Sequence, residues 1–208
     1  MLSSPHSYTD ACDRLLKSHH AQDMSPVIAA AVSAGEAILK IYNQDDFGIE
    51  YKEKDRSPIT KADRAANEII VEALLKHFPD IPIISEENDI PTFEARKNWK
   101  RFWLVDPLDG TTEFLKKNGE VPVTPPQTQD GVPVFGVIYA PALEELYFGG
   151  KKIGSWKVTK NSWPVQIFSE PKPVGSPLHL LSSRSHKSDS DNNKVIESLG
   201  LKIEKTTE

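Results

Sequence analysis

Cysteine is nearly absent from this chain of 208 residues, in which Cys12 is the only one. A single thiol cannot form an intrachain disulfide, and such usage is typical of proteins from a reducing compartment. The N-terminal segment lacks the apolar run of a secretory signal peptide, and we find no window with the length of a membrane span. These absences predict a cytoplasmic protein, with peripheral attachment at the inner membrane left open.

The chain also lacks an excess of basic residues. Its 25 Lys and Arg residues against 30 Asp and Glu residues give a formal charge of −5. Proteins that bind nucleic-acid polymers carry basic surfaces, so the charge argues against that class of partner, while bound cations would still let a small phosphorylated ligand bind. With 38% hydrophobic and 26% charged residues, the sequence is typical of a globular protein with one large or two small domains.

Two acids in the middle of the chain form its most informative feature. Asp106 and Asp109 stand three residues apart, directly after the apolar, strand-like segment 102–105. A tight turn at Gly110 and Thr111 into a helix would leave backbone N–H groups free for a phosphate oxygen. Paired carboxylates at a strand end suit Mg²⁺, whereas Asp-Pro and Asp-Gly are also common turn dipeptides. Alone, the segment fits a turn and a metal site about equally well.

Two further segments carry acids with local alternatives. Glu86 and Glu87 end the apolar segment 81–84, where an acid pair can be a metal ligand or a solvated surface pair. Thr60 and Asp63 have the spacing of a capping box, with Thr60 as the N-cap of a helix. A capping role for Asp63 is compatible with a catalytic one.

Together these segments resemble the inositol-monophosphatase superfamily of Mg²⁺-dependent sugar and nucleotide phosphatases. The matching elements are Pro58-Ile-Thr-Lys-Ala-Asp63, Ile84-Ser-Glu-Glu87 and Asp106-Pro-Leu-Asp-Gly-Thr111. Longer stretches are similar to its bacterial 3′(2′),5′-bisphosphate nucleotidase branch, namely residues 51–58, 78–88 and 109–120. The resemblance implies an α/β (α+β) fold, a layered αβαβα sandwich whose C-terminal part is incomplete here.

The resemblance also implies a metal site. Glu86, Asp106 and the backbone carbonyl of Leu108 would hold one Mg²⁺, and Asp106 and Asp109 would hold a second. The number of ions stays open, because the family closes its second site with another Asp in a Trp-Asp-x-Ala-Ala-Gly-like motif. That motif does not occur before Glu208. If residues 1–208 are the whole protein, we expect weak activity.

Roles for the nucleophile and the phosphate follow from the same resemblance. Asp63 would accept a hydrogen bond from the Thr111 hydroxyl, and this pair would orient the attacking water and help to deprotonate it. The N–H groups of Gly110 and Thr111 would hold the phosphate. The residues expected to contact substrate are Glu86, Leu108, Asp109, Gly110 and Thr111.

The function implied is hydrolysis of 3′-phosphoadenosine 5′-phosphate to AMP and phosphate, a reaction of sulfur metabolism. An inositol- or sugar-phosphate phosphatase is the alternative within the same class. A non-catalytic fragment that binds metal weakly or serves as an interaction module is the alternative from another class. The sequence leaves the oligomeric state open.

Periodicity and turn residues give the expected organisation. We expect a poorly packed N-terminal extension at 1–24, a metal-binding α+β domain at 25–170, and the start of a C-terminal α/β domain at 171–208. Expected helices are 25–42, with Ser25 as N-cap, 60–77 and 192–199, and expected strands are 47–52, 133–139, 145–148, 151–158 and 179–183. Residues 121–129 contain three prolines, which predicts an irregular segment where the family has a strand.

Overall fold

The computed structural model describes most of the chain. Its residues are 5, 7–19, 23–44, 46–53, 56–117, 122–171, 173, 175–181, 196, 198 and 203–207. The chain divides into two compact units, Met1–Ile167 and Phe168–Glu208, and each is described by itself.

A seven-stranded mixed sheet forms the centre of the first unit. The strand order is β3-β4-β5-β6-β7-β8-β9, in which β3 and β4 are parallel and every later neighbour is antiparallel. The strands are β3 (Ile83–Ser85), β4 (Arg101–Val105), β5 (Gln127–Gln129), β6 (Val132–Ala140), β7 (Glu145–Gly150), β8 (Gly154–Thr159) and β9 (Val165–Ile167). The strands predicted at 133–139, 145–148 and 151–158 correspond to β6, β7 and β8.

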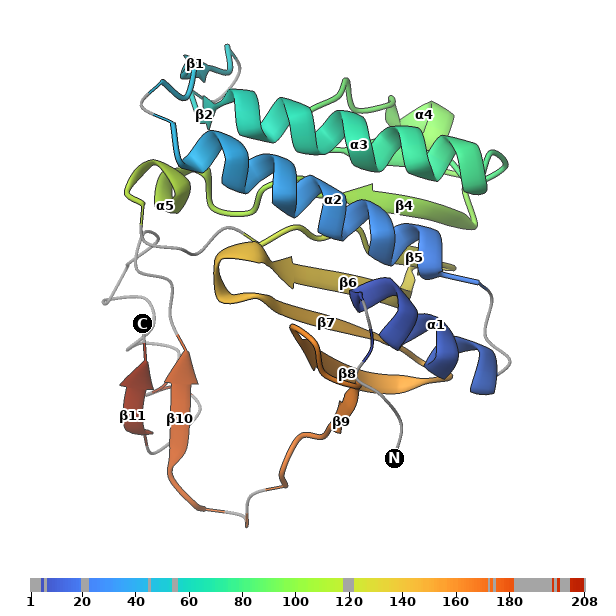
Figure 1. Cartoon of the computed structure of the whole chain (residues 1–208), viewed down its shortest axis with the longest axis vertical. Helices are drawn as coiled ribbons and strands as arrows, with labels where there is room; N and C mark the ends of the chain where they lie inside the picture. Colours follow the sequence, from blue (N-terminus) through green and yellow to red (C-terminus); the bar gives the residue numbers. More distant parts are fainter. Residues whose placement is uncertain are drawn as a thin grey trace. The chain divides into compact units, whose positions relative to one another are not determined.

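Three helices lie on one face of this sheet (Figure 1). They are α1 (Tyr8–Ser18), α2 (Ser25–Tyr42) and α3 (Lys61–His77), so both helices predicted in this region are present. Gly35 lets α2 approach the sheet closely, because a Cβ there would stand 2.6 Å from two ring atoms of Tyr139 on β6. The N-cap of α2 is Met24 rather than the predicted Ser25, which is the first helical residue.

The helix α2, with 18 residues, is long and apolar enough to cross a membrane by length and composition alone. The expectation that no window has the length of a membrane span is therefore wrong by this measure, although the helix itself was predicted. Seven of its residues are buried, among them Ile28, Ala31 and Ile38, and the helix packs on α3 and β6. This burial is the pattern of a core helix in a globular domain.

The expectation of a poorly packed extension at 1–24 is wrong for α1. Ser7 caps this helix by accepting a hydrogen bond from the Asp10 N–H, and Ala11, Cys12 and Leu16 are buried. The reason is a helical apolar period, Tyr8, Ala11, Cys12, Leu15 and Leu16, in an otherwise polar segment. α1 packs on α2 and β8 as part of the core.

The expectation of an irregular segment at 121–129 is also wrong within its described part, 122–129. Val123 exchanges two backbone hydrogen bonds with Tyr139, Thr124 exchanges two with Asp106, and β5 then pairs with both β4 and β6. The prolines lie between the residues whose N–H groups the ladder uses, and Pro126 contributes its carbonyl as an acceptor for Leu104. Proline removes a donor only at its own position, so the segment still joins the sheet.

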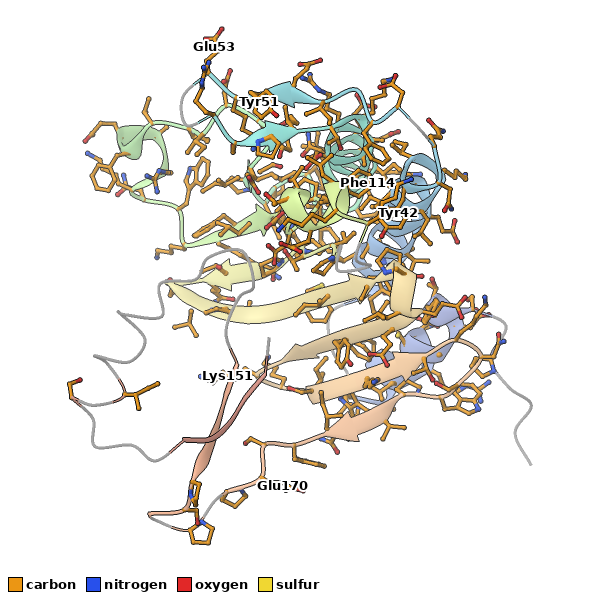
Figure 2. All side chains as sticks on the ribbon, turned by 90° about the vertical axis from the view of Figure 1, so that its left-hand side faces the viewer. Tyr42, Tyr51, Glu53, Phe114, Lys151 and Glu170 are labelled. Atoms are coloured by element: carbon orange, nitrogen blue, oxygen red, sulfur yellow. The ribbon has the colours of Figure 1, made fainter. Side chains whose placement is uncertain are left out.

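Shorter elements complete the first unit. They are β1 (Glu50–Tyr51), β2 (Pro58–Ile59), α4 (Phe93–Arg96), α5 (Thr111–Leu115) and a 3₁₀ turn at Pro141–Leu143. The predicted strand 47–52 is thus reduced to two residues. α5 is anchored by Phe114, which is fully buried and contacts Tyr42 at a ring-centroid distance of 5.4 Å (Figure 2).

The second unit contains β10 (Leu178–Leu181) paired in parallel with β11 (Ile203–Thr207). β10 begins one residue before the predicted strand 179–183, of which residues 182 and 183 are not described. The predicted helix 192–199 lies mostly outside the described residues, although Ile196 and Ser198 are helical.

Candidate active site at the ends of β3 and β4

The parallel pairing of β3 with β4 brings two of the predicted acids together. Ser85 is in register with Val105, so the next residues along each strand, Glu86 and Asp106, leave the sheet side by side. The Glu86 N–H continues the ladder by donating to the Val105 carbonyl at 3.0 Å. The sheet therefore fixes the backbone under both carboxylates.

Asp106 lies in an environment that disfavours its charge. Burial first, and then the charges of Glu86 and Asp109, raise the pKa of Asp106 from 3.8 to about 7, although a hydrogen bond from the Leu108 N–H acts in the opposite direction. Its Oδ1 is buried and has no hydrogen-bond partner among the described residues. A buried carboxylate oxygen without a donor costs free energy, which a bound cation would recover.

The turn after Asp106 is held in place at both ends. The Asp109 N–H donates to the Pro122 carbonyl at 3.0 Å, and Gly110 adopts the left-handed conformation with φ 86° before α5 begins at Thr111. Glycine takes this conformation without steric cost. Among the described residues, no hydrogen bond engages the N–H groups of Gly110 and Thr111.

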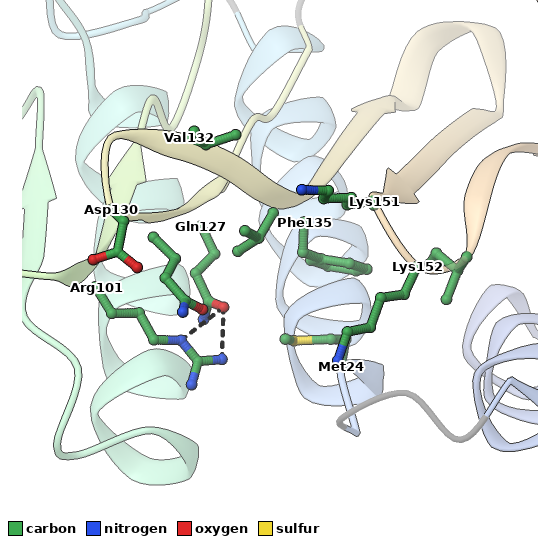
Figure 3. A pocket seen from close by; sticks show the side chains of 12 residues that line it. Met24, Arg101, Gln127, Asp130, Val132, Phe135, Lys151 and Lys152 are labelled. Atoms are coloured by element: carbon green, nitrogen blue, oxygen red, sulfur yellow. Dashed lines mark hydrogen bonds between the residues drawn. The ribbon is translucent and has the colours of Figure 1, made fainter.

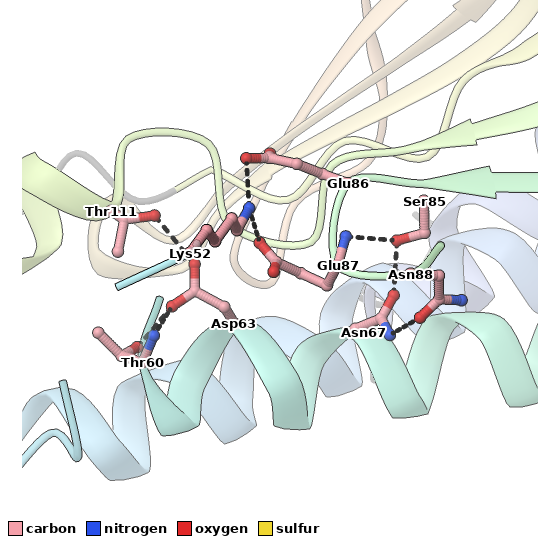
Figure 4. A network of polar contacts seen from close by, with 9 residues as sticks. All are labelled: Lys52, Thr60, Asp63, Asn67, Ser85, Glu86, Glu87, Asn88 and Thr111. Atoms are coloured by element: carbon pink, nitrogen blue, oxygen red, sulfur yellow. Dashed lines mark hydrogen bonds and ion pairs between the residues drawn. The ribbon is translucent and has the colours of Figure 1, made fainter. Parts of the chain in front are cut away.

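The two carboxylate oxygens of Asp63, at the start of α3, accept hydrogen bonds from different residues (Figure 4). Oδ2 accepts hydrogen bonds from the N–H and the hydroxyl of Thr60 at 2.7 and 2.6 Å, which completes the predicted capping box. Oδ1 accepts from the hydroxyl of Thr111 at 2.9 Å, 48 residues further along the chain. Asp63 is 1% exposed, so these contacts are shielded from water.

Lys52, after β1, is a site residue that the sequence reading missed. Its ammonium donates to Glu86 at 2.9 Å and to Glu87 at 3.0 Å (Figure 4). Burial alone would lower the pKa of Lys52, but the hydrogen bonds and charges of the two glutamates outweigh it and raise the pKa. Burial raises the pKa of Glu87, whose side chain is only 4% exposed, while Lys52 counteracts this rise. The only sequence signal was the position of Lys52 in a stretch that resembles the nucleotidases.

The residues around Asp106 fit a hard divalent cation by their chemistry. Glu86, Asp106 and Asp109 supply only oxygen donors, and one of these oxygens is buried without a partner. In the part of the chain that is described, however, no three acid, histidine or cysteine side chains are arranged as a ready metal cage. The ammonium of Lys52 pairs instead with the Glu86 carboxylate that a cation would share.

A pocket of about 290 Å³ opens beside Glu86 and Asp106. The rest of its lining is largely apolar and comes from the ends of β3 and β4 and from the proline-rich segment: Ile84, Ser85, Ile90, Leu104, Val105, Thr124 and Pro126. Two larger pockets are also present in the first unit, and one of them shares Thr124 and Pro126 with this pocket. The smaller pocket is the one relevant to a bound cation, because the carboxylates of Glu86 and Asp106 are part of its lining.

The chain is similar to one known protein family over most of its length. Residues 21–203 match the model of the inositol monophosphatase family. The 3′(2′),5′-bisphosphate nucleotidase CysQ of Salmonella typhimurium is 42% identical over 167 residues, which cover 80% of this chain and 65% of the relative. CysQ of Escherichia coli K12 is 37% identical over 177 residues, which cover 85% of this chain and 69% of the relative. The chain therefore spans about two thirds of the length of these relatives.

Solved structures give the same result for the fold. CysQ from Bacteroides thetaiotaomicron superposes with a TM-score of 0.67 at 33% identity, covering 87% of this chain and 70% of that one. An IMPase from Thermotoga maritima superposes with a TM-score of 0.65 at 24% identity, covering 86% and 65%, and supports the fold alone. The predicted α/β fold class and the resemblance on which it rested are both confirmed.

Proposed function

This chain belongs to the inositol monophosphatase family, and on that premise we propose that it is a metal-dependent phosphomonoesterase of the 3′(2′),5′-bisphosphate nucleotidase type. Its substrate would be 3′-phosphoadenosine 5′-phosphate, which it would hydrolyse to AMP and phosphate. The 37–42% identity to proteins named CysQ supports this substrate.

One observation supports catalysis most directly, the hydrogen bond from Thr111 to Asp63. A capping box needs only the Oδ2 atom of Asp63, so the engagement of Oδ1 by a distant hydroxyl goes beyond what the helix requires. Because the Thr111 proton is committed to Asp63, the hydroxyl oxygen is left as an acceptor. This oxygen can then hold and orient a water molecule by accepting a hydrogen bond from it.

The acids at the ends of β3 and β4 would supply the cation site. Glu86, Asp106, the Leu108 carbonyl and Asp109 would hold Mg²⁺, and the N–H groups next to Asp109 would contact the phosphate. A bound Mg²⁺ would neutralise phosphate charge and acidify a bound water. Glu86 would become available when its ion pair with Lys52 opens.

A matched pair of substitutions at Thr111 tests the proposal. Thr111→Val keeps the shape of the side chain but removes the hydroxyl, whereas Thr111→Ser keeps the hydroxyl. With Mg²⁺ and 3′-phosphoadenosine 5′-phosphate, the valine variant should release phosphate about 100-fold more slowly than the unsubstituted chain, which is the lower end of the range for lost general-base assistance. The serine variant should keep most of the rate.

Two results would contradict the proposal. Equal rates of phosphate release for the valine and serine variants would contradict the proposal that the Thr111 hydroxyl orients the attacking water. Absence of any phosphate release that depends on Mg²⁺ and is abolished by EDTA would reject the phosphatase activity itself. Faster hydrolysis of inositol 1-phosphate than of the bisphosphate nucleotide would retain the activity and reject the substrate.

A further inference from the structure

A second pocket, of about 580 Å³, lies at the opposite end of β4 from the acids (Figure 3). Arg101 begins β4 and Asp106 follows its last residue, so the two sites are about 17 Å apart along an extended strand, at about 3.3 Å per residue. Its lining comes from the start of α2, from β4 to β6, and from the turn between β7 and β8. The volume is within the usual range for pockets that bind small molecules, roughly 300–1,000 Å³.

Gln127 on β5 gives this pocket a hydrogen-bond donor that has no partner. The side chain is fully buried, and its Oε1 accepts from the Nε and Nη2 atoms of Arg101 at 3.0 and 2.7 Å. Because a guanidinium can only donate, this contact fixes which end of the amide faces Arg101. The Nε2 end is buried without a hydrogen-bond partner among the described residues. Such a donor lowers the stability of the folded chain unless an acceptor reaches it.

The other residues that line the pocket are mainly positively charged or apolar. Lys151 and Lys152 project from the turn between β7 and β8, and Phe135 lies between Arg101 and Lys152 (Figure 3). Met24, Phe135 and Ile153 are each at most 6% exposed. Asp130 is the acid of the lining, so cationic side chains predominate there although the whole chain has a formal charge of −5.

From these contacts we propose that this pocket binds a small organic anion, a carboxylate or phosphate on an apolar body about the size of one aromatic ring. The apolar body packs on Phe135 and Met24. The anion lies near Lys151 and Lys152, and one of its oxygens accepts the free donor of Gln127. The site is separate from the acids at the other end of β4.

Titration with benzoate, followed by amide NMR of the full chain, tests the proposal. Benzoate has the ring and the charge but no phosphate ester, so it is not a phosphatase substrate, and neutral benzamide is its matched control. We expect saturable shifts at the Gln127 side-chain amide and at residues 150–153 with benzoate, and much weaker ones with benzamide. Shifts of equal size with both compounds, or no saturable shift at these residues at millimolar benzoate, would overturn the proposal.

Substitutions distinguish a specific binding site from non-specific attraction of the anion to positively charged side chains. Gln127→Glu keeps an acceptor for Arg101 but replaces the donor with a negative charge, and it should weaken benzoate binding at least about tenfold, as expected for a lost hydrogen bond to a charged group. Gln44→Glu makes the same charge change at an exposed position after the C-terminal end of α2, at the other end of that helix from Met24, and should leave the affinity unchanged. Equal effects of these two variants would contradict a specific site, provided that the Gln127→Glu spectrum remains that of a folded chain.

The lysines provide a test that does not disturb the core. Replacing both Lys151 and Lys152 by Gln should weaken benzoate binding roughly fivefold, since each exposed charge contributes a factor of about two to the affinity. Lys40→Gln removes an exposed lysine from the last turn of α2, at the other end of that helix from Met24, and should have no effect. Unchanged affinity in the double variant would show that the lysines do not hold the anion and would overturn this part of the site.

Discussion

Asp106→Asn tests whether the acids at the ends of β3 and β4 repel one another in the metal-free protein. Asp106 lies close to Glu86 and Asp109, and its buried Oδ1 has no hydrogen-bond partner among the described residues. Asparagine keeps the shape of the side chain and an oxygen for the Leu108 N–H, but it removes the charge. Without divalent cations, the substitution should therefore increase the free energy of unfolding at neutral and alkaline pH.

The magnitude follows from the pKa of Asp106, which rises from 3.8 to about 7 in the folded chain. At about 1.4 kcal/mol per pH unit, this rise corresponds to at most about 4 kcal/mol. Because the side chain is only partly buried, solvent screening reduces our expectation to about 2 kcal/mol. Since the folded state holds its proton more tightly than the unfolded state, the free energy of unfolding falls as the pH rises from about 4 to about 7. The Asn variant should lack this fall.

Urea unfolding in EDTA, from about pH 5 to about pH 8, measures the effect across most of this window. Asp80→Asn is the control, because it removes a charge from an exposed position in the turn after α3. Added Mg²⁺ should stabilise the unsubstituted chain more than Asp106→Asn, since a ligand that binds only the folded state adds to its stability. An Asn variant that is less stable than the unsubstituted chain at about pH 8 in EDTA would refute the repulsion argument.

Two further predictions concern packing and charge. Gly35→Ala should lower the free energy of unfolding by about 1–3 kcal/mol in urea, because overpacking against the sheet outweighs a gain of about 1 kcal/mol in helix propensity. An unchanged or higher stability would mean that α2 does not approach the sheet as closely as described. Lys52→Met should destabilise the chain by about 2 kcal/mol, since it leaves the buried Glu87 carboxylate without its cation. Because protonation of Glu87 relieves this, the loss should shrink as the pH is lowered to about 5, and a loss that is independent of pH would contradict the reasoning.

Much of the site was predictable from local sequence patterns. The capping box at Thr60 and Asp63 is visible in four residues, and two apolar strands that end in acids predict that Glu86 and Asp106 meet if the strands are parallel neighbours. Lys52 could not be assigned in this way. Its partners stand 34 and 35 residues away, and their pairing depends on how β1 approaches the end of β3.

The errors in the fold prediction have physical causes. In α1, apolar residues recur at helical spacing from Tyr8 to Leu16, but the polar composition of the segment concealed this period. In 122–129, counting prolines gave the wrong answer, because a ladder needs N–H groups only at particular positions. Val123 and Thr124 supply them there, and Pro126 supplies an acceptor.

Asp63 caps α3 and also accepts the hydrogen bond from Thr111 on which the proposed catalysis depends. The substitution Asp63→Asn can separate these two roles. The two donors from Thr60 require an oxygen at the Oδ2 position, so the amide nitrogen of the variant must take the Oδ1 position and face Thr111. The capping box then survives, but the amide donates to the Thr111 hydroxyl, whose proton must point elsewhere. Thr111 would present a donor rather than an acceptor to a nearby water and would lose the role proposed for it. We therefore expect an unfolding free energy within about 1 kcal/mol of the unsubstituted chain, together with a loss of phosphate release at least as large as that of Thr111→Val. A folded Asp63→Asn variant with full activity would show that the direction of this hydrogen bond does not matter for the chemistry.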